Sequence, residues 1–113
     1  MIIDQARSEA AAERLTALLL ADRFRSARRL LGWRLLVHGS KRTMRQEWQQ
    51  VLTRCSCEPV EAHPAGTEPF GKYMIVDRII VGRNGGDFRV RCAVNRRGRI
   101  TSLFFLPRDA AMS

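Results

Sequence analysis

The first half of the chain carries apolar residues at helical spacing. In residues 4–20 they recur at i, i+4, i+7 and i+8, which is the stripe of an amphipathic helix. The members of this stripe are Ala11, Leu15, Leu18 and Leu19. Asp4 stands where a helix N-cap is expected, because its carboxylate can accept a hydrogen bond from a free backbone N–H. We therefore predict a first helix over residues 4–20.

Two further helices are predicted before residue 55. In the second, Phe24, Ala27 and Leu31 are spaced i, i+3 and i+7, with Asp22 as the expected cap and Gly32 as the end or bend. A short apolar segment follows and closes at residues 38–39. The third helix is expected over residues 40–54, and its buried stripe consists of Met44, Trp48, Val51 and Leu52.

The last third reads as consecutive β-strands. β-branched and aromatic residues dominate, and glycine-rich turns separate the runs. The predicted strands of this meander are residues 73–81, 87–95 and 100–106. A preceding strand is expected over residues 55–62, weakened by Pro59 in a way that suits an edge or a bulge. The composition of residues 63–69 predicts a loop. Pro107 is expected to stop the last strand and to leave residues 108–113 frayed.

These elements predict a single α+β domain over residues 1–113. Three N-terminal helices would pack on a curved antiparallel sheet of about four strands. No apolar run approaches the roughly 20 residues that a membrane helix requires. Charged residues interrupt the N-terminal apolar positions, so the segment lacks the apolar core of a signal peptide. We expect no membrane association and a cytoplasmic location.

The charge balance adds one unusual observation. The net charge is +9, and 18 of the 20 basic residues are arginine. Such a surface attracts polyanions. A genome rich in G and C would produce the same arginine bias without selection for binding, and this is the simpler interpretation. Basic residues outnumber acidic ones in both halves of the sequence, so there is no basic tail or arm.

The cysteines do not indicate a metal centre. The three cysteines, Cys55, Cys57 and Cys92, are an odd number in a chain without a predicted export signal, which favours reduced thiols. Cys-x-Cys without a second pair at metal spacing is a weak zinc signal, even with His63 nearby. We predict small buried side chains, with no metal and no cofactor.

Asp77 is the most informative acidic residue. It lies between Ile75 and Ile79 on one face of a predicted strand, where desolvation would raise the pKa of the carboxyl, as an interior general base requires. An ion pair with Arg89 or Arg91 of the next strand is the favoured alternative. His38 and Tyr73 are weaker catalytic candidates. A histidine beside a helix-ending glycine more often donates to the local backbone.

The order of the elements resembles the nuclear-transport-factor-two-like superfamily, a cystatin-like cone, and most closely its small uncharacterised bacterial branch. The resemblance is carried by residues 18–24 with Ala27, by Trp48 in the third helix, and by residues 94–105 as the last hairpin. The glycine that this branch often has before the first strand is absent, because residues 53–55 read Thr-Arg-Cys. No catalytic motif of the superfamily matches residue by residue.

The resemblance implies a cone that encloses a pocket, and often a homodimer formed through the sheet. The candidate pocket residues are Trp33, Trp48, Tyr73, Asp77, Phe88 and Phe104.

We consider three functions, in order of preference. The first is a non-catalytic domain that binds a small hydrophobic molecule or a protein. The second is an isomerase or cyclase that uses Asp77, and the third is nucleic-acid binding, disfavoured because the aromatic residues lie in apolar patterns.

Overall fold

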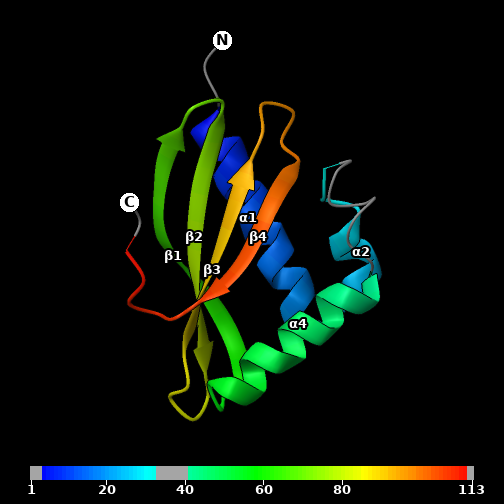
Figure 1. Cartoon of the computed structure of the whole chain (residues 1–113), viewed down its shortest axis with the longest axis vertical. Coiled ribbons are helices and arrows are strands. Elements are labelled where there is room, and N and C mark those ends of the chain that lie inside the picture. The colour runs from blue at the N-terminus through cyan, green and yellow to red at the C-terminus, as the bar shows by residue number, and fades with distance from the viewer. Residues whose placement is uncertain (1–3, 33–40, 112–113) are drawn as a thin grey trace.

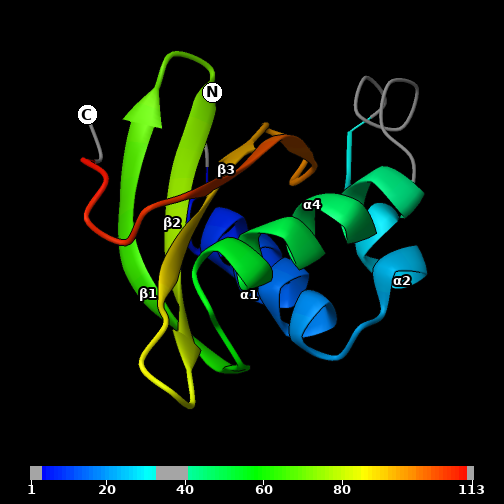
Figure 2. The same cartoon turned by 60° about the horizontal axis from the view of Figure 1, so that its bottom comes forward.

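The computed structural model describes residues 4–32 and 41–111, with the side chains of residues 41–43 excepted. The helices are α1 (Gln5–Leu20), α2 (Phe24–Arg28) and α4 (Lys41–Arg54). The strands are β1 (Pro59–Phe70), β2 (Tyr73–Gly82), β3 (Phe88–Val94) and β4 (Ile100–Leu106). The strands form one antiparallel sheet in the order β1-β2-β3-β4, and the helices lie on one side of it (Figures 1 and 2). The predicted α+β class and the antiparallel meander are confirmed.

The two ends of α1 are fixed by local hydrogen bonds. The carboxylate of Asp4 accepts from the N–H of Arg7 at 3.1 Å, as predicted for the N-cap. The prediction that Asp22 caps the second helix is wrong, because Asp22 instead closes α1 with a φ of 62°. Its N–H donates to Leu19 and the next N–H donates to Leu18, which is a Schellman motif. Hydrogen bonds to the carbonyl groups of Leu18 and Leu19 therefore hold Asp22 in this conformation.

β1 is the element that differs most from the prediction. The strand predicted over residues 55–62 is confirmed for residues 59–62, and the edge or bulge expected at Pro59 is confirmed as well. The loop predicted over residues 63–69 is wrong, because β1 continues from Pro59 to Phe70 along β2. An edge strand has one side without ladder hydrogen bonds, so prolines fit there. Register irregularities between Pro59 and Glu61 and between Pro64 and Gly66 absorb the remaining misfit.

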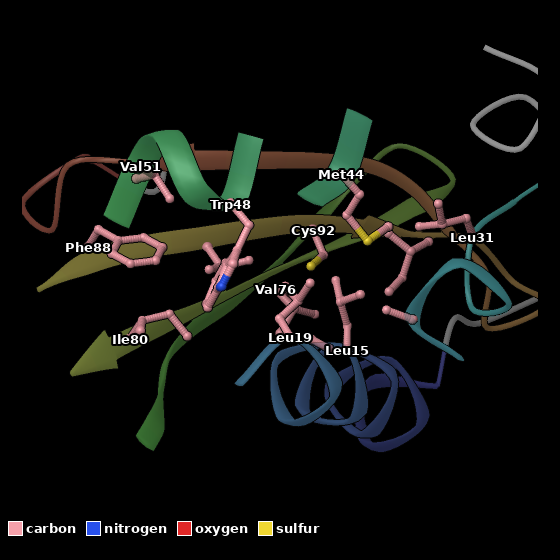
Figure 3. Packing of buried hydrophobic residues seen from close by; sticks show 14 of the residues in the cluster. Leu15, Leu19, Leu31, Met44, Trp48, Val51, Val76, Ile80, Phe88 and Cys92 are labelled. Carbon is pink, nitrogen blue, oxygen red and sulfur yellow. The ribbon is translucent and has the colours of Figure 1, made fainter. Parts of the chain in front are cut away.

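The core fills the space between the helices and the sheet. Trp48 of α4 packs edge-to-face against Phe88 and Phe105, with ring centroids 5.6 and 5.8 Å apart respectively. Figure 3 shows Trp48 reaching from α4 toward the sheet, with Leu15 and Leu19 of α1 on the opposite side of the cluster. The helix-facing side chains of β3 are fully buried; they are Phe88, Val90, Cys92 and Val94.

The same face also buries one polar contact. Arg78 of β2 donates from Nε to the hydroxyl of Thr16 in α1 at 3.1 Å and from Nη2 to the carbonyl of Ala62 at 3.3 Å. This contact ties α1 to the two strands at that edge of the sheet. Within residues 4–32 and 41–111, no helix has the length and apolar character needed to cross a membrane.

The two phenylalanines at positions 88 and 104 should respond differently to truncation. Phe88 is fully buried and Phe104 is 55% exposed on the opposite face. We expect Phe88→Ala to lower the free energy of unfolding by about 3–5 kcal/mol, because it leaves a cavity in the core. Phe104→Ala should cost less than about 1 kcal/mol. Urea denaturation followed by circular dichroism measures both, and similar costs would contradict the packing described.

Candidate functional site

Asp77 forms the centre of a buried ionic cluster on the sheet face turned away from the helices. Arg91 lies directly opposite it on β3 and donates from Nε and Nη2 to the two carboxylate oxygens, at 2.9 Å each. Arg89 adds a third bond, from Nη1 to Oδ2, at 2.8 Å. The hydrogen bonds to Asp77 raise the pKa of Arg91 above its ordinary value, while desolvation acts in the opposite direction. The predicted ion pair is confirmed, with both arginines taking part.

The same arginines hold the C-terminal segment against the outer face. Arg89 donates to the carbonyl of Arg108 at 3.0 Å, and Arg91 donates to the carbonyl of Ala111 at 2.6 Å. The guanidinium of Arg108 pairs in turn with Asp87. The predicted fraying is therefore wrong for residues 108–111, because charged hydrogen bonds between distant parts of the chain hold them. Figure 2 shows this segment (red) crossing the sheet toward β1.

Asp77→Asn should destabilise the protein, because an amide removes the negative charge that the two guanidinium groups face. Both arginines retain some solvent contact, so we expect a loss of about 2–3 kcal/mol, at or below the lower end of the range for a broken buried pair. Asp109→Asn, at an exposed carboxylate, is the control and should be neutral. Urea denaturation measures both variants, and an equal response would contradict the structural role of Asp77.

A groove of about 1030 Å³ lies beside this cluster on the outer face. Its apolar lining comes from all four strands or their ends, and consists of Phe70, Tyr73, Ile75, Ala93 and Phe104. Phe70 is 71% exposed, and Phe104 is 55% exposed. Basic side chains complete the groove at its rim; they are Lys72, Arg91, Arg96 and Arg97. The groove therefore combines exposed apolar side chains with positive charge at its rim.

The residues predicted to line one pocket lie on two sides of the sheet. Trp48 and Phe88 are buried under the helices, whereas Tyr73, Asp77 and Phe104 belong to the outer face. The sheet itself separates the two sets, because successive side chains of a strand point to opposite faces. Phe105 is the residue of β4 that meets Trp48. The predicted pocket residue Trp33 and the catalytic candidate His38 lie outside the described residues.

A second groove, of about 930 Å³, lies between α2 and the turn that joins β3 to β4. The side chain of Asn95 shapes this turn by accepting from the N–H groups of Arg97 and Arg99, at 2.9 and 3.0 Å. Arg99 then reaches back to the carbonyl of Arg29 at 2.6 Å. Five arginines line the groove: Arg25, Arg28, Arg29, Arg97 and Arg99.

The arginines of the second predicted helix suggest phosphate binding, although a solvated helix face is the simpler interpretation of that segment alone. A comparison of the charges by halves of the sequence does not bring these arginines together with Arg97 and Arg99. The concentration of basic residues is visible when the charges are counted over shorter stretches of the sequence. Residues 23–46 contain eight basic residues and no Asp or Glu, and residues 88–108 contain six and none. The fold brings residues 23–32 of the first stretch against the second, because Leu31 bridges to Ile100 at the start of β4.

The three cysteines are free thiols. Cys57 is buried, and this burial raises its pKa above the ordinary value. The complete burial of Cys92 raises its pKa to about 12. Within residues 4–32 and 41–111, no three His, Cys, Asp or Glu side chains come together as metal ligands. His63 lies 3.3 Å from the carboxylate of Glu61.

These environments predict selective thiol chemistry. At pH 8 the half-buried Cys55 should react with a disulfide reagent in the native protein, whereas Cys57 and Cys92 should react only after unfolding. Mass spectrometry of alkylated peptides, with and without denaturant, measures this. Rapid labelling of Cys92 in the native protein would contradict its burial.

A scan against protein-family models gave no match, and comparisons with curated proteins and with solved structures gave none either. The Asp77 cluster and the two grooves are therefore the observations from which function has to be inferred.

Proposed function

We propose that this protein is a non-catalytic binding domain that uses the groove on the outer face of its sheet. The observation that carries the proposal is the exposure of Phe70 and Phe104 beside the basic rim. Large apolar side chains gathered on an open surface are typical of binding sites. The groove suits a ligand that combines a flat apolar part with negative charge.

The state of Asp77 supports binding over catalysis. Three hydrogen bonds from arginines engage its two oxygens, so the carboxylate neutralises fixed cations. A general base needs an oxygen within reach of a substrate proton. The alternative proposal is an isomerase or cyclase in which Asp77 acts with Tyr73 or His38. Within the described residues, the tight packing of Trp48 and Phe88 on the helix side also favours binding at the outer face.

An aromatic sulfonate dye tests the groove directly, because its rings match the apolar lining and its charge matches the rim. We expect anilinonaphthalene sulfonate to fluoresce on binding and Phe104→Ser to weaken its affinity at least fivefold. Val60→Ser is the matched control, since Val60 is also exposed, at 45%, but does not line the groove. A fluorescence titration measures both. Equal affinities in the two variants would place the dye elsewhere and count against the proposal.

A homodimer through the sheet face is the second candidate, and the exposed phenylalanines also favour it. Glu61 and Glu68 of β1 would supply negative charge that pairs with the basic turn between β3 and β4 of a second copy. Sedimentation velocity at increasing protein concentration tests this pairing. A dimer of this kind should dissociate in Phe104→Asp and persist in Val60→Asp. A protein that stays monomeric at about 100 µM, or a dimer that is indifferent to Phe104→Asp, would remove the candidate.

We also propose membership of the nuclear-transport-factor-two-like superfamily and a cytoplasmic location. The support for the family is the order of helices followed by an antiparallel meander, with Trp48 central to the third predicted helix. The support for the location is that Cys55, Cys57 and Cys92 are free thiols, as is usual in a reducing compartment.

A further inference from the structure

The two grooves adjoin each other on the surface of the molecule. Gly32, Asn95 and Arg97 line both of them, so the surface is continuous from the outer face of the sheet, around the turn between β3 and β4, to α2. The first groove contributes aromatic side chains and the second contributes arginines. A ligand long enough to occupy both grooves would contact aromatic side chains in the first groove and arginines in the second.

The charge of this surface points to a polyanion. No Asp or Glu is among the described residues that line either groove. Arginines at this density repel one another, and an anion with several charges relieves the repulsion. Guanidinium groups also match phosphate oxygens with paired hydrogen bonds.

The aromatic side chains of the first groove indicate which class of polyanion would bind. Phe70, Tyr73 and Phe104 line the first groove, and the ammonium of Lys72 lies 5.7 Å from the ring centroid of Tyr73. Exposed aromatic rings beside a cationic track are the two components that proteins use to bind single strands, with bases stacked on the rings and phosphates along the track. A duplex keeps its bases stacked inside and cannot use the rings. An acidic peptide would use only the arginines.

We propose that the two grooves form one binding path for single-stranded nucleic acid. Bases stack in the aromatic groove, and phosphates follow the arginines of the turn and of α2. This inference rests on the proposed function, because it uses the same outer groove and names its partner class.

The test is fluorescence anisotropy of the full-length protein with labelled oligo(U) and oligo(dT) of about 12 nucleotides, within the usual site sizes. With about four phosphate contacts, the affinity should fall roughly fifty-fold between 50 and 200 mM salt. Phe104→Ala should weaken binding about tenfold with little change in this salt slope. Arg97→Gln should weaken binding and reduce the slope by about 0.7.

Arg83→Gln and Val60→Ala are the matched controls. Arg83 is an exposed arginine in the turn between β2 and β3 and lines neither groove. Its replacement lowers the net charge by the same amount as Arg97→Gln does. Both controls should bind nearly as tightly as the natural sequence. If Arg83→Gln weakens binding as much as Arg97→Gln, the attraction is only that of a net positive charge and the proposal fails. Circular dichroism establishes that each variant is folded.

Two competitors decide between partner classes. A duplex of equal length and polyglutamate of equal charge should each bind more weakly, without a response to Phe104→Ala. If either binds as tightly as the single strand, the proposal is overturned in favour of that class. Loss of oligonucleotide binding alongside intact dye binding would overturn this inference and leave the proposed function standing. Failure of both probes would overturn both.

Discussion

The interaction on which the outer face depends is the pairing of Asp77 with Arg89 and Arg91. It joins β2 to β3, and through the carbonyl groups of residues 108 and 111 it also fixes the C-terminal segment. A carboxylate with 1% exposure is stable there only because charged donors surround it. The C-terminal segment in turn gives each arginine a further hydrogen-bond acceptor, so the cluster and the segment stabilise each other.

Much of the fold follows from local patterns, and the exceptions have identifiable physical causes. The helical stripes and the glycine turns predict α1 and the meander correctly, because hydrophobic period and turn chemistry are local properties. The continuation of β1 beyond residue 62 is not predictable in this way, since Pro64, Gly66 and Pro69 read locally as a loop and suit a strand only at an edge. Asp22 likewise takes a helix-ending conformation that is usually occupied by glycine.

The candidate site was only partly predictable, for a reason of geometry. The strand alternation places Phe104 and Phe105 on opposite faces, yet a run of apolar residues does not say which face each takes. Pairing with β3 decides it: Phe105 lies opposite buried Val90, and Phe104 lies opposite Arg91. The ion pair of Asp77 was predictable because both partners fall on neighbouring strands of one meander. The arginine groove was not, because α2 and the β3–β4 turn are far apart in sequence.

The two faces of the sheet therefore differ in what covers them. Packing against α1 and α4 consumes the inner face, where Trp48, Phe88 and Ile80 leave little room for a ligand. On the outer face, the ionic cluster and the C-terminal segment occupy the part nearest Asp77. The remaining outer surface carries exposed rings and passes directly into the arginine groove. Because burial of a ring stabilises a fold and its exposure does not, Phe70 and Phe104 add little to stability, and their positions fit the binding surface proposed above.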